Sequence, residues 1–90
     1  EEFLELSHEE AAYIEMKLAL AGALKEERRR KKLTQTQLAQ RIESSQSRVA
    51  KMEAADPTVS IDLLVRSLLA LGVTKRDLAK TIAASDSKAA

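Results

Sequence analysis

The sequence LTQTQLAQRIESSQSRVAKME at residues 33–53 constrains the fold of this chain more than any other feature. It contains two short segments with helical spacing of apolar residues, separated by a polar turn. Thr34, with Gln37 three residues later, forms a capping box that opens the first segment, and Ser45 is an N-cap for the second. Two capped helices joined by a tight turn predict a helix-turn-helix. Ala39 is small enough to allow the two helices to approach closely, and Ile42, Val49 and Met52 are expected to close the apolar contact beneath the turn.

A long helix is predicted ahead of this motif. Ser7, followed by Glu10, forms another capping box, and apolar residues recur with helical spacing over residues 13–24. Few helix-breaking residues precede Lys32, so a single helix of roughly 24 residues is expected. Gly22 marks the alternative, which is a bend or a close contact with another helix.

Two more helices are predicted in the C-terminal half. The signals are a break at Asp56-Pro57, an N-cap at Ser60, a terminating Gly72, and the pair Thr74 and Asp77 before a last helix to about Ala84. The apolar stripe of residues 61–71 is expected to be core, although its excess of Leu would also suit a dimer surface. We therefore expect a helical extension at residues 1–19, a helix-turn-helix domain at 20–84 and a flexible tail at 85–90.

The composition narrows the class of protein. Hydrophobic residues make up 44% of the 90 residues and aromatic residues only 2%, so the core must be aliphatic. The scarcity of Gly (2) and Pro (1) argues against the many turns of an all-β domain. The absence of Cys excludes disulfides, thiolate metal sites and thiol catalysis, and it fits a reducing cytosol. No apolar run approaches the roughly 20 residues of a membrane span, and no signal peptide is visible.

An enzyme is the least favoured class. His8 is the only histidine and stands alone in the first turn of the predicted long helix, so we interpret it as a surface residue. There is no P-loop and no Gly-rich phosphate-binding fingerprint. No cofactor and no metal are expected.

Charge is distributed unevenly, although the net charge is only +1. Residues 1–24 carry six Glu and one Lys, a net −5, whereas residues 25–53 carry nine Lys or Arg and four Glu, a net +5. The positive field therefore centres on the predicted helix-turn-helix. A basic run precedes the motif, and four of its members either contact phosphates or form a hydrated helix end that offsets the macrodipole: Arg29, Arg30, Lys31 and Lys32.

The spacing of the motif suits recognition of duplex DNA. In a helix-turn-helix the second helix enters the major groove, and its N-terminal residues face the base edges. The start of that helix presents Gln46, Ser47 and Lys51. Gln can pair bidentately with adenine, and Lys can donate to guanine acceptors. Gln35 lies at the N-terminus of the first motif helix, where its amide and nearby backbone N–H groups are suited to bind a phosphate.

The pattern LTQTQLAQRI-ESS-QSRVAKME, followed by a loop and SIDLLVRSLLALGVT, resembles the Cro/CI-type (XRE family) helix-turn-helix proteins over roughly residues 20–83. The resemblance implies an all-α, five-helix lambda-repressor-like DNA-binding domain, here with an extended N-terminal helix. It also implies a cytoplasmic transcriptional regulator of bacterial or phage type, commonly a repressor. Such a protein binds double-stranded DNA as a homodimer on an inverted repeat, with half-sites about 34 Å apart.

The resemblance assigns roles to individual residues. Base contacts are implied for Gln46, Ser47, Lys51 and Arg48. Phosphate contacts are implied for Gln35, Thr34 and Ser45. A structural ion pair is implied between Arg28, on the preceding helix, and Glu53, at the end of the recognition helix.

Two positions depart from the family pattern. The family often has Gly where this chain has Lys32, before the first motif helix, and Glu43, in the turn. A left-handed backbone at these positions would cost a non-Gly residue roughly 1 kcal/mol. Glu43 also places a negative charge near the expected DNA face.

The run LELSHEEAAYIEMKLALAGAL lies outside the minimal family domain. An extension of this kind on a short chain is similar to HigA-like antitoxins, which repress their own operon and bind a HigB/RelE-type ribonuclease toxin. A toxin protein is therefore a candidate partner. Tyr13, Ile14 and Met16 on this acidic extension are expected either to fold back on the domain or to dock a partner.

Overall fold

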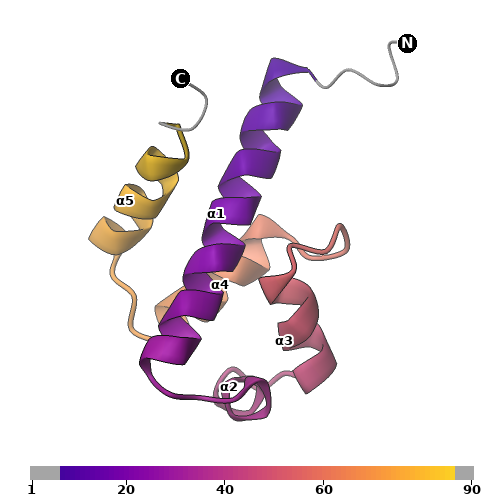
Figure 1. Ribbon diagram of the computed structural model, residues 1–90, viewed down its shortest axis with the longest axis vertical. Helices are drawn as coiled ribbons and strands as arrows, with labels where there is room; N and C mark the ends of the chain where they lie inside the picture. The colour runs from indigo at the N-terminus through magenta and orange to yellow at the C-terminus, as the bar shows by residue number, and fades with distance from the viewer. Residues whose placement is uncertain (1–6, 87–90) are drawn as a thin grey trace.

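Five α-helices form the structure, a computed structural model that describes residues 7–86. They are α1 (His8–Arg30), α2 (Gln35–Arg41), α3 (Gln46–Glu53), α4 (Ile61–Ala70) and α5 (Lys75–Asp86). No strand occurs within the described range. The predicted all-α, five-helix fold is confirmed, and Figure 1 shows α2 and α3 gathered near the C-terminal end of α1.

The long N-terminal helix is also confirmed. α1 has 23 residues and begins at the capping box predicted from Ser7 and Glu10, in which each residue binds the backbone N–H of the other. The helix is continuous through Gly22, so the bend considered there does not occur. Over its described part, the extension predicted at residues 1–19 belongs to α1 and continues directly into the segment that packs on the domain (Figure 1).

Local side-chain caps start the other helices where the sequence indicates. Thr34 and Gln37 form a reciprocal capping box at α2, with hydrogen bonds of 2.8 and 3.0 Å. The Oγ atoms of Ser45 and Ser60 accept from the backbone N–H of Arg48 and Leu63, each at 3.1 Å. Thr74 and Asp77 cap α5 in the same reciprocal way. These caps satisfy N–H groups that have no partner inside a helix.

Four helices end in a left-handed residue. After α4 this residue is a glycine, Gly72, with φ 92°. After the other three helices it carries a side chain: Lys32 follows α1 with φ 60°, Glu43 follows α2 with φ 56°, and Ala55 follows α3 with φ 54°. At each end the next N–H reaches back to a carbonyl five residues earlier, as when Ser44 donates to Ala39 O over 2.8 Å. The left-handed geometry expected at the family's Gly positions is therefore present with Lys and Glu side chains.

The core is aliphatic and lies where α1 crosses the other helices. Its most buried members come from all five helices and the loop before α4: Leu20, Ala21, Leu24, Leu38, Ala39, Val49, Met52, Val59, Leu64, Leu68, Leu71 and Leu78. Burying a Leu side chain stabilises a fold by about 1.5–3 kcal/mol. Ala39, Val49 and Met52 are buried as predicted, and Ile42 packs partly buried against them. These contacts hold α2 and α3 in a fixed relative orientation.

The end of the chain differs from the prediction. α5 continues to Asp86, whereas the sequence was interpreted as helical to about Ala84 with a flexible tail from Ser85. Ser85 is only 6% exposed, and its Oγ donates to Ile82 O over 2.7 Å. The small hydroxyl side chain is therefore accommodated inside the helix against the domain. Residues 87–90 of the predicted tail lie outside the described residues.

Candidate DNA-binding interface

The N-termini of α2 and α3 lie side by side and are joined through two glutamine side chains. Nε2 of Gln46, the first residue of α3, donates to Oε1 of Gln35, the first residue of α2, over 2.7 Å. The tight turn between the helices, closed by the left-handed Glu43, makes this approach geometrically accessible. The predicted phosphate anchor and the first predicted base reader are thus direct neighbours.

A chain of hydrogen bonds continues from this pair into the domain. Gln35 Nε2 donates to Glu53 Oε1 over 3.2 Å. Arg28 Nε and Nη2 donate to Glu53 Oε2 and Oε1 over 2.5 and 3.0 Å, and Arg28 Nη1 donates to Leu33 O over 2.9 Å. Because a carboxylate only accepts hydrogen bonds, the amide N of Gln35 must face Glu53. Its Oε1 is left to accept from Gln46, and this orients the exposed glutamine.

The ion pair at the base of this chain is shielded from solvent. The Arg28 side chain is 13% exposed and that of Glu53 is 4% exposed. The hydrogen bond that Arg28 donates to Glu53 raises the pKa of Arg28 above its ordinary value. The two side chains meet in the bidentate geometry that fits guanidinium to carboxylate. The pair therefore connects the C-terminal end of α1 to the C-terminal end of α3.

The remaining predicted base readers lie exposed along α3. Ser47, Arg48 and Lys51 line a groove of about 330 Å³ between α3 and the loop that precedes α4. The loop contributes Thr58 to the same groove. A groove with hydroxyl, guanidinium and ammonium donors is suited to an anionic, hydrogen-bonding ligand.

The comparison with family models decides the assignment. The helix-turn-helix family model matches residues 24–78, which is most of the domain and includes both α2 and α3. The chain belongs to the Cro/CI-type (XRE) helix-turn-helix family. It is therefore a DNA-binding transcription regulator whose ligand is double-stranded DNA. Searches of curated proteins and of solved structures found no match.

In this Cro/CI-type domain, hydroxyl residues stand at the starts of both motif helices and act as caps. Thr34 Oγ1 accepts from Gln37 N, and Ser45 Oγ accepts from Arg48 N. Ser45 Oγ also lies 3.3 Å from Ser47 Oγ. A capping hydroxyl still has its own O–H to donate, so a phosphate contact remains compatible with the cap.

In this Cro/CI-type domain, the basic residues of the run 28–32 have different partners. Arg28 is the partner of Glu53. Arg30 binds Glu27 over 2.5 and 3.2 Å, and Lys31 lies 3.7 Å from the same carboxylate. The hydrogen bond from Arg30 lowers the pKa of Glu27. Among the described residues, Arg29 and Lys32 are exposed and form no ion pair, so they are the members of the run with free charge.

Two features of this Cro/CI-type surface were absent from the sequence interpretation. Thr58 donates from its N and Oγ1 to Asp56 Oδ1 over 2.9 and 2.7 Å, which fixes the loop beside α3. The Asp56-Pro57 break was a signal for a loop here, but only the fold brings that loop next to Lys51. Arg41 lines a separate cleft of about 690 Å³ behind the turn, together with Arg48 and Arg66, and it had no motif to mark it.

Two other kinds of site were sought in the described part of the chain, a membrane-spanning helix and a metal centre. None of its helices is long and apolar enough to cross a membrane. Within residues 7–86 no group of three His, Cys, Asp or Glu side chains is placed to hold a metal ion. His8 is exposed in the first turn of α1, in agreement with its interpretation as a surface residue.

Proposed function

We propose that this protein recognises a specific operator as a homodimer on an inverted repeat, and that it represses transcription from the promoter it covers. The observation that carries the proposal is the Gln46–Gln35 contact, because it fixes an exposed amide at the start of α3. A preorganised side chain loses little conformational entropy when it binds a base. One N–H and the Oε1 of Gln46 stay available, and an adenine edge needs both.

The proposal divides the surface into readers and anchors. Base edges are read by Gln46, Ser47, Arg48 and Lys51. Phosphates are held by Gln35, Thr34 and Ser45. Support for the division comes from position: the four readers are exposed along α3, whereas Thr34 and Gln35 stand at the start of α2 and Ser45 caps the start of α3.

The test is selection from random double-stranded oligonucleotides, followed by titration of the selected site. We expect an inverted repeat with half-sites about one helical turn apart, near 34 Å. We also expect affinity to fall steeply with salt, because phosphate binding releases counterions. Equal affinity for selected and random duplex, or affinity independent of salt, would overturn the proposal.

A second candidate function is that of a HigA-like antitoxin, in which DNA binding serves autoregulation. The observation in its favour is a cleft of about 470 Å³ on the extension, lined by Tyr13, Lys17, Ala55 and Pro57 among others. Tyr13 is 48% exposed although it is one of the few aromatic residues. Exposed apolar surface rimmed by charge is typical of protein-binding sites.

The antitoxin function is tested by coexpression with the small gene adjacent to this one. If that gene encodes a ribonuclease toxin, we expect growth arrest to be relieved by the wild-type protein and not by a Tyr13→Glu variant. The variant should still bind operator DNA, since Tyr13 lines its cleft with Ala55 and Pro57, which follow the C-terminal end of α3, whereas Gln46 and Ser47 stand at the N-terminal start of that helix. A toxin that stays active in the presence of excess wild-type protein would reject this function.

A further inference from the structure

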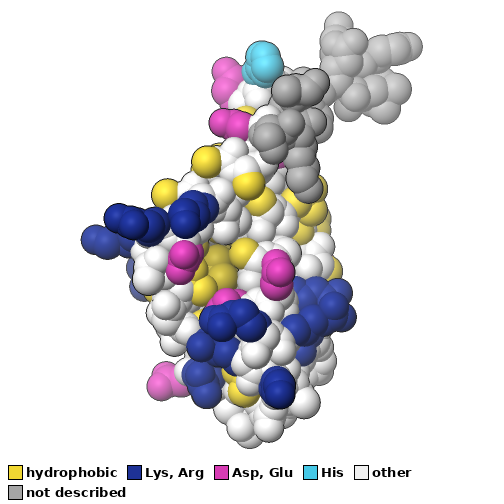
Figure 2. Space-filling view, turned by 60° about the vertical axis from the view of Figure 1, so that its left-hand side comes forward, with side chains coloured by type: hydrophobic (Ala, Val, Ile, Leu, Met, Phe, Trp, Pro, Cys, Tyr) yellow, Lys and Arg dark blue, Asp and Glu magenta, His cyan; other side chains and the backbone are white. Residues whose placement is uncertain are grey.

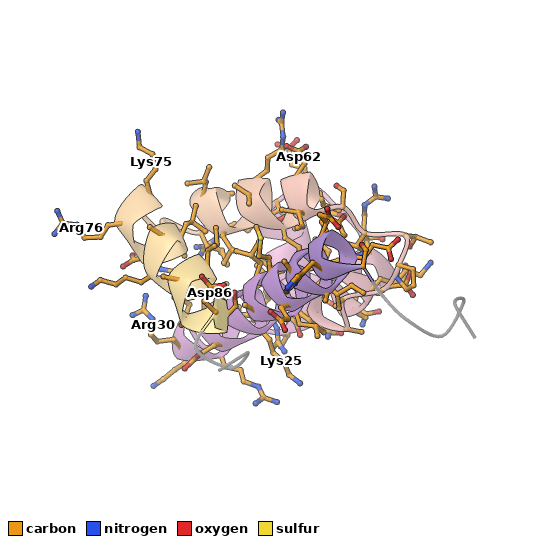
Figure 3. The ribbon with its side chains drawn as sticks, turned by 90° about the horizontal axis from the view of Figure 1, so that it is seen from above. Lys25, Arg30, Asp62, Lys75, Arg76 and Asp86 are labelled. Carbon is orange, nitrogen blue, oxygen red and sulfur yellow. The ribbon has the colours of Figure 1, made fainter. Side chains whose placement is uncertain are left out.

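The outward face of α1 carries two aliphatic side chains that are largely exposed in a single chain. Leu18 is 56% exposed and Ile14 is 41% exposed, although the core residues of the same helix, such as Leu20, are fully buried. Gly22 and Lys25 continue this exposed face toward the C-terminal end. Figure 3 shows Lys25 projecting from α1 away from Asp62 on α4. Figure 2 shows further hydrophobic side chains at the surface around the upper half of the molecule.

No contact within a single chain requires a glycine at position 22. It lies in the middle of a helix of 23 residues, where Gly costs about 1 kcal/mol relative to Ala. A Cβ atom built on Gly22 meets no atom within 4 Å, so a larger residue would fit. The residue therefore leaves a depression on the surface of α1. That depression lies one turn from the exposed Leu18, at the i, i+4 spacing that places two residues on one face.

A cleft extends the depression toward α5. It has a volume of about 460 Å³ and is lined by Glu15, Leu18, Gly22 and Glu26 of α1 and by Thr81 of α5, among others. A protruding Leu and an adjacent hollow on the same face are what a self-complementary interface requires, because a two-fold interface uses one patch twice.

When two copies of this face pack antiparallel, the charges of one copy are complementary to those of the other. Glu15 and Arg29 lie seven residues before and after Gly22, which places both on the Gly22 face of the helix, two turns to either side. Within residues 7–86 neither side chain takes part in an ion pair. In an antiparallel pair of α1 helices that cross at Gly22, Glu15 of each copy lies opposite Arg29 of the other. A parallel pair would instead place like charges together.

We propose that this face of α1 is the homodimer interface, packed antiparallel on the same face of a second copy with the crossing at Gly22. Leu18 of each chain occupies the hollow beside Gly22 of its partner, and the aliphatic stem of Lys25 covers it. Gly at the crossing allows the helix axes to approach to the short end of the usual 8–10 Å range. The proposal specifies the dimer on which the proposed operator binding rests.

The experiment is sedimentation equilibrium of the full chain without DNA. Wild type is expected to be a dimer, and Leu18→Glu should raise its dissociation constant at least about tenfold by placing a charge in an apolar contact. Leu69→Glu is the matched control, because Leu69 is 46% exposed but lies on α4. Circular dichroism and the melting temperature, extrapolated to the same oligomeric state, show that each variant is folded.

Charge-reversal variants test whether the occupant of this face is a second copy of the chain or a different partner. Glu15→Arg and Arg29→Glu should each weaken the dimer about tenfold, and the double reversal should restore it, since the two opposing pairs are then re-formed with exchanged signs. Gly22→Leu should abolish dimerisation and raise monomer stability. A wild-type monomer overturns the proposal, and so does a dimer insensitive to Leu18→Glu and to both single reversals. A dimer that forms as expected but shows no DNA preference would overturn the operator function and leave this interface intact.

Discussion

Gln46 at the start of α3 and Gln35 at the start of α2 are 2.7 Å apart, joined by a hydrogen bond from Nε2 to Oε1. Nε2 of the same Gln35 amide donates to Glu53, and Glu53 also accepts from Arg28. An exposed side chain at the tip of the recognition helix is therefore oriented by an ion pair at the opposite end of that helix. This relationship makes the effects of substitutions along the chain distinguishable.

Replacing Gln46 with Ala should relax base preference with little effect on the fold. The side chain is exposed, and its only hydrogen bond among the described residues is the one to Gln35. Loss of a bidentate base contact costs about 1–3 kcal/mol at the affected base pair. Competition binding with operators changed at single positions measures this, and one position should lose its discrimination. An unchanged preference at every position would show that Gln46 does not read a base.

Replacing Gln35 with Ala should weaken binding to all sequences, because a phosphate contact carries no sequence information. The structure adds a second effect, since Gln46 then loses the acceptor that orients it. We expect reduced affinity for random duplex and a smaller additional loss of preference at the position read by Gln46. The double substitution should lose less than the sum of the singles. Strict additivity would contradict the coupling between the two amides.

Replacing Arg28 with Ala should destabilise the domain by about 3 kcal/mol, because it leaves a buried carboxylate without its charged partner and with only the hydrogen bond from Gln35. The Glu53 side chain is 4% exposed, so this cost exceeds the 0–1 kcal/mol typical of a surface pair. Glu53→Gln should cost less, since an amide keeps an acceptor for Arg28. Urea unfolding gives the free energies. The exposed pair Arg66–Asp62, with side chains 76% and 73% exposed, is the control, and Arg66→Ala should change stability little.

Much of the fold was predictable because its signals are local. A capping box needs only two residues three apart, as with Thr34 and Gln37, so helix starts can be recognised from the sequence. The left-handed ends at Lys32 and Glu43 were expected from the family pattern, but the one at Ala55 was not, because Ala carries no turn signal. The sequence also left open whether Gly22 marks a bend or a close contact with another helix. Only the structure answers this, since a neighbouring element decides whether a helical Gly is crowded.

The site was predictable in its members but not in its connections. Gln35 and Gln46 are eleven residues apart, and no sequence pattern states that their amides meet. Thr58 joins the groove beside Lys51 only because the loop before α4 is folded against α3. Tertiary contacts between loops depend on the whole core, and for this reason local reasoning did not find them.

Acid should weaken the fold in part through Glu27, together with Asp56 and Asp77, whose pKa values are also lowered by hydrogen bonds from Thr58 and Thr74. The hydrogen bond from Arg30 lowers the pKa of Glu27 below the ordinary value of 4.5. The unfolded chain therefore binds this proton more readily than the folded chain, so the stabilisation is complete above pH 4.5 and is lost as pH falls through the folded pKa. Glu27→Gln should flatten the stability profile in that window. Thermal midpoints across the acid range measure it, and a variant profile parallel to that of wild type would contradict the assignment.

Glu43→Gly should raise both stability and DNA affinity. Glu43 has φ 56°, a conformation that costs a side-chain-bearing residue roughly 1 kcal/mol and Gly almost nothing. Part of this gain is offset by the greater freedom of Gly in the unfolded chain, so we expect a net stabilisation of about 0.5 kcal/mol. Removing the carboxylate beside the start of α3 also removes repulsion of DNA phosphates, an effect that salt should screen.

Two matched substitutions separate the backbone effect from the charge effect. Lys32→Gly relieves a similar backbone, at φ 60°, but removes a positive charge, so it should stabilise the fold and weaken DNA binding. Ala55→Gly relieves φ 54° with no change of charge, so it should stabilise the fold and leave affinity as it is. Unfolding free energies and salt-dependent binding isotherms of the three variants test this. If affinity changed equally in all three, the charge of Glu43 would have no part in DNA binding, and the gain would come from rigidity of the turns alone.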